Sequence, residues 1–301
     1  RSMPQRGREL STAIVASGRR LAVARSYVRC YLSCAESIGS GTLMASGVFR
    51  LSQTETPLID VIVDQHPNSG VFNMAMDASL LQLAADREIS VVRIYEWSEP
   101  TVTLGYFQAT GLDTQSPFPS LPVVRRLSGG GAILHHHEIT YSLVLPATHP
   151  ARQDPSGVYE VVHLAIISLL LEIGVECQLR SEFDAANPVV SNTLDGGIAE
   201  PFLCFLRKNP NDIVHRTSNK IVGSAQRRRK GVTLQHGSII LKASVLAPQV
   251  LGIVDLVPDS CMSRFRQKLP QVIAAAIGEI LNFREFSQQE TSLAAEIAKG
   301  N

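Results

Sequence analysis

The sequence predicts a single α+β domain in which helices pack on a mixed β-sheet. Short runs rich in β-branched residues recur along the chain, interleaved with stretches whose apolar residues keep helical spacing. Hydrophobic residues make up 45% of the 301 residues and charged residues 18%, which supplies side chains for a substantial core. No internal repeat or low-complexity tract divides residues 57–301. One domain over that range is therefore the simplest architecture.

Residues 1–56 differ in composition from the rest of the chain. Eight arginines but only two acidic residues precede Leu51. An arginine- and serine-rich, acid-poor segment is typical of an organelle transit peptide. It also arises when a gene start is placed too far upstream; Met44 is then the true start, and this is the interpretation we favour. We therefore expect a poorly structured N-terminal extension over residues 1–56 and the folded domain, with a helical C-terminal tail, over 57–301.

The first half of the domain is expected to combine strands with one long helix. A strand at Leu58–Asp64 comes first, and the helix follows over Val71–Asp86. Asn68, Ser69 and Gly70, just before this helix, supply residue types suited to a turn and to an N-cap. Further strands are expected at Val91–Trp97, Thr101–Leu104, Val123–Val124 and Thr140–Leu145.

The second half is expected to begin with a helix over Val158–Ile173, which Gly174 ends. The Asn-, Asp-, Gly- and Pro-rich stretch Asp184–Pro201 is typical of a loop. Beyond residue 242 the pattern is largely helical, most clearly at Gln271–Leu281 and Glu290–Lys299. Strands are expected at Val175–Leu179, Asp212–His215, Lys220–Val222 and Val232–Leu241.

A run of three glycines between predicted strands is the first candidate for a binding site. The stretch from Val123 to Pro146 reads VVRRLSGGGAILHHHEITYSLVLP. Glycines let backbone N–H groups approach a ligand closely, and neighbouring cations suit an anionic or carbonyl-bearing group. An ordinary hairpin or bulge would also contain such a run. The candidate binding residues here are Arg125, Arg126, Ser128, Gly129, Gly130, Gly131 and His135.

Cys204 and Lys220 are candidates for nucleophilic chemistry. The thiolate is the reactive form of cysteine, and a nearby cation favours it. Lys220 would supply that cation if the fold brings it close, and it would also polarise an acyl carbonyl group. The alternative is that Cys204 is a buried, inert residue.

Two other clusters are weaker candidates. Of the three consecutive histidines, only His135 and His137 would share one face of a strand, and no partner at a familiar zinc spacing accompanies them. We therefore expect no metal site. The cationic run Arg227–Lys230 is typical of a solvated turn, although it would also attract an acidic protein partner.

Composition excludes several classes of function. The formal net charge of +1 argues against a general nucleic-acid binder, which usually carries a basic domain. No apolar run approaches the ~20 residues of a membrane-spanning helix. Five scattered cysteines do not make a disulfide framework, so we expect a reducing, cytoplasmic location.

The glycine-rich stretch and the region around Lys220 together resemble the catalytic domain shared by lipoate–protein ligases, octanoyl transferases and biotin protein ligases. RRLSGGGAILHHHEITYS resembles the family's RRxSGG-xAxxH segment, and NKIVGSAQRRRKGVTLQHGSIIL resembles its KxxGSAxR…HGSxL segment. NMAMDASLL and RIYEWSEPTVTLGYFQ resemble the opening helix and the strands after it. The resemblance covers about Leu58 to Leu241 in the family's order, and it implies a biotin/lipoate protein ligase-like fold.

Within this family the motifs of the sequence favour acyl transfer over ATP-dependent ligation. HHHEITYS resembles the transferase pattern, a histidine followed by Glu-x-Thr-Tyr-Ser, and Cys204-Phe205 lies near the Cys-Phe of the cysteine-dependent transferases. The chain after Leu241 is also short for the accessory domain of many ligases. Two positions depart from the pattern: Gly131 replaces a frequent arginine of the transferases, and His136 replaces an aspartate that is usual in both groups.

The resemblance implies transfer of an octanoyl group from acyl carrier protein to a lysine of a lipoyl-accepting protein, such as the glycine-cleavage H protein or a dehydrogenase lipoyl domain. Cys204 would carry the acyl group as a thioester and Lys220 would orient its carbonyl, with no ATP or metal required. Three alternatives stay open: an ATP- and Mg²⁺-dependent lipoate–protein ligase, a lipoyl amidotransferase, and a non-enzymatic binder of lipoyl domains or acyl groups. The resemblance adds to the predicted binding residues Gly223, Ser224 and Ala225.

Overall fold

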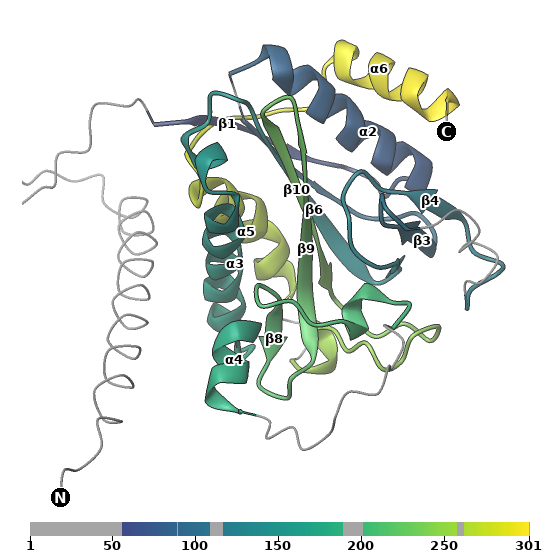
Figure 1. Cartoon of the computed structure of the whole chain (residues 1–301), viewed down its shortest axis with the longest axis vertical. Coiled ribbons are helices and arrows are strands. Elements are labelled where there is room, and N and C mark those ends of the chain that lie inside the picture. The colour runs from purple at the N-terminus through teal and green to yellow at the C-terminus, as the bar shows by residue number, and fades with distance from the viewer. Residues whose placement is uncertain (1–55, 89, 109–116, 189–200, 258–261, 301) are drawn as a thin grey trace, which may run out of the picture. The chain divides into compact units, whose positions relative to one another are not determined.

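The computed structural model describes residues 56–88, 90–108, 117–188, 201–257 and 262–300. The extension expected over residues 1–56 lies outside the described residues, apart from Thr56. An eight-stranded mixed sheet forms the centre of the domain, in the order β11-β1-β2-β6-β10-β9-β8-β7 (Figure 1). Its strands are β1 (Leu58–Val63), β2 (Ser90–Tyr95), β6 (Glu138–Leu145), β7 (Cys177–Leu179), β8 (Ile213–His215), β9 (Lys220–Arg229), β10 (Val232–Ile240) and β11 (Glu279–Phe283).

Parallel and antiparallel pairing are both present, so the predicted mixed sheet is confirmed. Strand β1 pairs in parallel with β2 and β11, and the other neighbours in this sheet run antiparallel. A second sheet of three strands has the order β4-β3-β5. Its strands are β3 (Thr101–Leu104), β4 (Val123–Arg125) and β5 (Ile133–His135).

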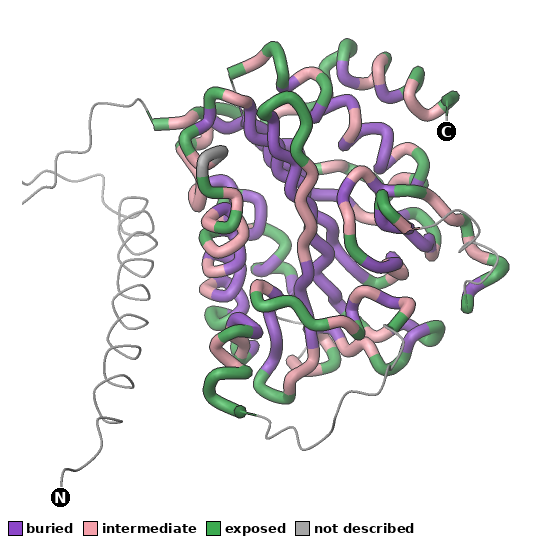
Figure 2. Tube along the Cα trace, viewed as in Figure 1, coloured by how far each residue is buried: buried purple, intermediate pink, exposed green. Residues whose placement is uncertain are grey.

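Helices cover both faces of the large sheet (Figure 1). Figure 2 shows the buried strands running between these helical layers. Side chains alternate along each strand: Val61 and Leu143 pack in the core with α3 and α5, whereas their neighbours Ile62 and Val144 pack with α2. The helices are α2 (Gly70–Leu83), α3 (Pro155–Glu172), α4 (Arg180–Ala186), α5 (Met262–Ala275) and α6 (Gln288–Lys299).

Helix α3 is more apolar than was predicted from the sequence. Within the described part of the chain it is the one helix long and apolar enough to cross a membrane by length and composition. Its residues Val162 and Ile166 are fully buried in the core under the large sheet. Packing inside the domain therefore accounts for the apolar residues on the buried face of this helix.

The C-terminal part of the chain contains a strand that was not expected. The helix predicted over Gln271–Leu281 is wrong in its second half, because α5 ends at Ala275 and β11 begins at Glu279. The amide of Glu279 donates to the carbonyl oxygen of Pro57 at 2.9 Å, and β11 continues alongside β1. Pairing with a strand distant in the sequence overrides the local helical pattern.

The arginine run also differs from the prediction. Arg227, Arg228 and Arg229 belong to β9, which is longer than the predicted strand, and the turn itself is Lys230-Gly231. Both turn residues have positive φ, 50° and 83°. This is the conformation of a two-residue β-hairpin whose turn matches the twist of its strands.

Glu290 fastens α6 to the rest of the domain. Its buried carboxylate accepts hydrogen bonds from Arg87, Arg284 and the amide of Ser287, at 2.6–2.9 Å. Burial alone would raise the pKa of Glu290, but the bonds from Arg284 and Ser287 outweigh it and lower the pKa to about 2.

Replacing Glu290 with glutamine should remove a pH-dependent part of the stability. A carboxylate whose folded pKa is depressed stabilises the fold above its unfolded pKa of 4.5, and this contribution is lost as the pH falls toward 2. The shift corresponds to about 3 kcal/mol. We expect Glu290→Gln to lower the free energy of unfolding in urea by about this amount at pH 7 and to flatten its decline between pH 4.5 and 2. An equally steep decline in the variant would contradict this role.

Candidate active site

A cavity of about 280 Å³ lies between the two sheets and is lined by residues from both. Its apolar wall includes Met74, Trp97, Ile133 and Phe205. Its polar wall includes the two residues predicted to carry the chemistry, Cys204 and Lys220. The other predicted residues that line it are Arg126, Gly129, Gly130, His135, Gly223, Ser224 and Ala225.

Cys204 is held at the start of a short 3₁₀ helix, Cys204–Leu206. Its amide donates to the carbonyl oxygen of Ala132 at 2.7 Å, which ties this helix to the chain just before β5. The side chain is half-buried, and its sulfur lies 3.8 Å from the position that a Cβ on Gly130 would occupy. The thiol therefore faces the glycine loop and is not sealed in the interior.

Lys220 is brought to the same wall by β9. Its buried ammonium group lies 2.9 Å from the carboxylate of Asp212 and donates to the carbonyl oxygen of Cys204 at 3.3 Å. Burial raises the pKa of Asp212, and the ion pair with Lys220 opposes that rise. A cation is thus fixed beside the backbone of the residue that carries the thiol.

Arg126 shapes the glycine loop. Its Nη2 donates to the carbonyl oxygens of Gly129 and Gly131 at 2.8 and 2.6 Å. Burial lowers the pKa of Arg126 to about 10, so the group stays cationic at neutral pH. Gly130 has a φ of 94°, a conformation that side chains disfavour, and a Cβ there would lie 3.1 Å from Arg126 Nη2.

Three predicted binding residues, Arg125, Ser128 and Gly131, do not line the cavity. Arg125 points to the other side of the loop, where its Nη1 donates to the carbonyl oxygens of Gly105 and Gln108. Ser128 is fully buried and forms a short hydrogen bond with His236 Nε2. Arg125 and Ser128 therefore hold the loop in place.

His135 lines the cavity but has no free nitrogen for proton transfer. Its Nδ1 lies 2.7 Å from the carboxylate of Glu138, and its Nε2 lies 2.8 Å from the hydroxyl of Thr103. The ring stacks on Trp97 with centroids 3.8 Å apart. Burial lowers the pKa of His135, which keeps it neutral. His135 therefore forms part of the wall of the cavity.

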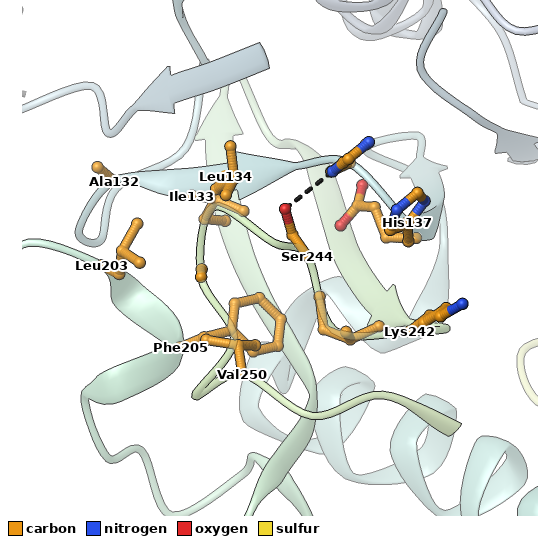
Figure 3. Close-up of a pocket in the computed structure, with 13 residues that line it drawn as sticks. Ala132, Ile133, Leu134, His137, Leu203, Phe205, Lys242, Ser244 and Val250 are labelled. Atoms are coloured by element: carbon orange, nitrogen blue, oxygen red, sulfur yellow. Dashed lines mark hydrogen bonds between the residues drawn. The ribbon is translucent and has the colours of Figure 1, made fainter. Parts of the chain in front are cut away.

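His136 lines a second, smaller cavity of about 20 Å³, which is also lined by Ile133 and Leu134 of β5 (Figure 3). His136 Nδ1 bonds the hydroxyl of Ser244 at 2.8 Å, and its ring stacks on His137. Gly131, the other departure from the family pattern, lies beside the side chain of Arg207. A Cβ at residue 131 would lie 2.6 Å from the guanidinium carbon of Arg207. Arg207 thus fills the space beside residue 131.

No metal centre is found in the part of the chain that the structure describes. No group of three His, Cys, Asp or Glu side chains there is close enough to hold an ion. His135 and His137, the pair considered from the sequence, have separate partners: His135 bonds Glu138 and His137 stacks on His136.

Ser224 presents backbone groups at an uncovered edge of the large sheet. Strand β8 pairs with β9 only as far as Val222. The backbone N–H of Gln226 bonds the hydroxyl oxygen of Tyr159 and therefore points away from β10. Burial raises the pKa of Tyr159 to about 12, and this hydrogen bond opposes the rise. Alternate residues of a strand direct their backbone groups to the same side. The N–H of Ser224 therefore points past the end of β8, toward the cavity that Ser224 lines.

Gly223 leaves room for the side chain of Lys220, and we expect Gly223→Ala to displace it. An added Cβ would lie 2.4 Å from Lys220 Cε and 2.9 Å from Nζ. Because Lys220 is buried and paired with Asp212, its displacement also weakens that ion pair, and the free energy of unfolding should fall by about 1–3 kcal/mol. Enzymatic activity should fall by about tenfold or more, because a displacement of about 1 Å in an active site is costly. Activity equal to that of the parent chain would contradict the placement of Lys220.

The fold and this site define an enzyme that handles acyl groups: an apolar cavity ends at a thiol, an ammonium group and a loop of glycines. The chain belongs to the lipoyl protein ligase A/B catalytic-domain family, because residues 69–289 match the sequence model of that family. This confirms the predicted family and, at the level of the family, the predicted enzyme class.

Curated relatives named Octanoyltransferase LipM are similar to most of the chain. The protein of Lysinibacillus sphaericus is 31% identical over 216 residues, covering 70% of this chain and 75% of its own. The protein of Bacillus cereus is 32% identical over 239 residues, covering 76% and 81%.

Solved structures confirm the predicted fold class. A lipoate-protein ligase A bound with ATP has a TM-score of 0.58 at 20% identity, over 82% of this chain and 95% of that one. The bipartite lipoate protein ligase of Thermoplasma acidophilum has a TM-score of 0.58 at 19% identity, over 82% and 93%. At this level of identity the likeness concerns the fold.

Several polar residues at or near the cavity were not expected from the sequence, among them Asp212, His163 and His236. Asp212 stands at the start of a predicted strand, where a carboxylate next to an apolar run is a usable signal of a buried ion pair. His163 is a single histidine inside an apolar helix, and His236 lies in a strand. Neither has a local pattern that distinguishes it from core packing.

Proposed function

We propose that the protein transfers an octanoyl group from acyl carrier protein to a lysine of a lipoyl-accepting protein, without ATP or a metal ion. The observation that carries this proposal is the position of Cys204: half-buried, facing the glycine loop, with Lys220 bonded to its carbonyl oxygen. The relatives named octanoyltransferases support the same reaction. Transfer of a lipoyl group by the same steps is the close variant.

In the first step Cys204 attacks the thioester of the donor. The sulfur of Cys204, as thiolate, forms a bond to the acyl carbon, and the bond to the donor's sulfur breaks, with that sulfur leaving as a thiolate that takes up a proton. Lys220 stabilises the attacking thiolate. The N–H of Ser224, together with amides of Gly129–Gly131, is suited to stabilise the negative oxygen of the intermediate.

In the second step the lysine amine of the acceptor attacks the acyl group on Cys204. A carbon–nitrogen bond forms, the carbon–sulfur bond breaks, and the thiol of Cys204 is restored. The acceptor class is a lipoyl-accepting protein, such as the glycine-cleavage H protein or a dehydrogenase lipoyl domain. The apolar wall of Met74, Trp97 and Ile133 is suited to hold the acyl chain during both steps.

One comparison of donors tests the proposal. The enzyme is given octanoyl-acyl carrier protein in one arm, and free octanoate with ATP and Mg²⁺ in the other, and the acceptor lysine is followed by mass spectrometry. We expect modification in the first arm and none in the second. Modification only with free octanoate and ATP would identify a ligase, and modification in neither arm would favour a non-enzymatic binder.

A further inference from the structure

A chain of hydrogen bonds crosses the domain next to the cavity, from the carbonyl oxygen of Pro155 to that of Asn211. Every link measures 2.5–2.9 Å. The side chains in the chain are, in order, Gln226, Gln235, Tyr141, Ser224 and His163. Only Ser224 and Gln226 among them line the cavity.

The direction of each bond follows from the two ends. A backbone carbonyl oxygen only accepts, so Nδ1 of His163 must donate to Asn211. Burial lowers the pKa of His163 to about 4, so the ring is neutral and its Nε2 has no proton. The hydroxyl of Ser224 must therefore donate to Nε2, at 2.6 Å.

The hydrogen bonds at the Pro155 end are consistent with this, since from Gln226 onward each one is donated along the chain toward His163. The side-chain amide nitrogen of Gln226 donates to Pro155 and to the amide oxygen of Gln235. The amide nitrogen of Gln235 then donates to the hydroxyl oxygen of Tyr141 at 2.9 Å. Burial raises the pKa of Tyr141, so its hydroxyl keeps its proton and donates it to Ser224 at 2.7 Å.

Ser224 is left with a single unused hydrogen-bonding position. A hydroxyl has one hydrogen and two lone pairs. His163 takes the hydrogen and Tyr141 takes one lone pair. The remaining lone pair can only accept, so the Ser224 side chain cannot donate to a carbonyl oxygen in the cavity. A group with N–H bonds is the partner that suits it.

We propose that the hydroxyl of Ser224 accepts a hydrogen bond from the attacking lysine amine in the second step, and that His163 is a positioning residue that keeps this hydroxyl turned as an acceptor. This rests on the proposed function. The amine nitrogen, held through one N–H, directs its own lone pair at the acyl carbon on Cys204. The carbon–nitrogen bond forms, the carbon–sulfur electron pair returns to Cys204, and the proton lost by nitrogen ends on that sulfur.

His163 also connects this hydroxyl to the cation of the site. The carbonyl group that it binds belongs to Asn211, and the next residue, Asp212, is the ion-pair partner of Lys220. The positive charge of Lys220 helps to keep the pKa of His163 low, although burial is the larger cause. His163 therefore does not take up a proton in the reaction. Its role is to fix the orientation of the Ser224 hydroxyl.

The test separates the two steps in the intact chain. First, octanoyl-acyl carrier protein is added and the mass of the enzyme is followed; then the isolated acyl-enzyme is mixed with apo H protein and the loss of the octanoyl group to the acceptor is timed. For Ser224→Ala and His163→Leu we expect the rate of the second step to fall at least about tenfold more than the rate of the first. Equal losses in both steps, or no loss in the second, would overturn the proposal.

Two further variants guard against a general effect on folding. His163→Gln keeps a donor for Asn211 and an acceptor for Ser224, so it should recover most of the second-step rate that His163→Leu loses. His149 is the matched control: it too is buried and bonds a backbone carbonyl oxygen, that of Ile277, and it does not line the cavity. His149→Leu should leave the ratio of the two rates unchanged. A change in that ratio, or failure of His163→Gln to recover the rate, would refute the positioning role.

The outcome also distinguishes this inference from the proposed function. If the parent chain gains no octanoyl group, the thioester route itself is wrong. If the parent chain gains the group and the Ser224 and His163 variants pass it on at the parent rate, only the role of these two residues is wrong.

Discussion

Replacing Cys204 with alanine should abolish transfer of octanoyl groups from the carrier protein, with a loss on the order of 10³-fold or more. The reason is chemical: without the sulfur there is no nucleophile to form the intermediate, and the two steps cannot be separated in time. The fold should survive, because Cys204 is held mainly by its backbone, through the bond from its amide to Ala132. The measurement is the rate of modification of the acceptor lysine.

Cys177 provides the control for this experiment. It is the other free cysteine in the described part of the chain, and burial raises the pKa of its thiol to about 12. Cys177→Ala should transfer at the parent rate. If Cys204→Ala were as active as Cys177→Ala, a covalent route through residue 204 would be excluded.

Replacing Lys220 should damage both activity and stability, and a second substitution should separate the two effects. In Lys220→Met the cation beside the thiol is gone, and we expect transfer to fall by about 100-fold or more. The same change removes the partner of the buried Asp212 carboxylate, which lies 2.9 Å from Lys220 Nζ in the parent chain. Breaking a buried pair in this way costs about 3–5 kcal/mol of unfolding free energy.

In the double variant Lys220→Met/Asp212→Asn the unpaired charge is removed as well. We expect the free energy of unfolding, measured in urea, to recover by about 2 kcal/mol or more while transfer stays low. Recovery of activity together with stability would mean that Lys220 acts only through the fold.

The order of strands and long helices could be predicted because each is marked by local patterns. Strand β3 was predicted with its observed bounds, and α3 was predicted from a run of apolar residues closed by Gly174. Strands that depend on distant partners were missed. Residues Ile133–His135 carry little strand signal, yet they pair with β3, and β11 forms only because β1 lies beside it.

The site was predictable to the extent that its residues lie in recognisable stretches. The glycine loop, Cys204 and Lys220 stand in stretches of that kind, and the fold brings them to one cavity. The bonding of each side chain was not predictable, because it depends on contacts between segments far apart in the sequence. His163 and Ser224 are separated by 61 residues and Ser128 and His236 by 108. Spacing in the chain says nothing of such pairs.

The most direct test of the thioester route is to mix the enzyme with octanoyl-acyl carrier protein, without acceptor or ATP, and to digest and weigh its peptides. We expect one octanoyl group on the peptide that contains Cys204, removable by hydroxylamine and lost when apo H protein is added. An unmodified Cys204 in an enzyme that still modifies the acceptor lysine would contradict the proposed chemistry.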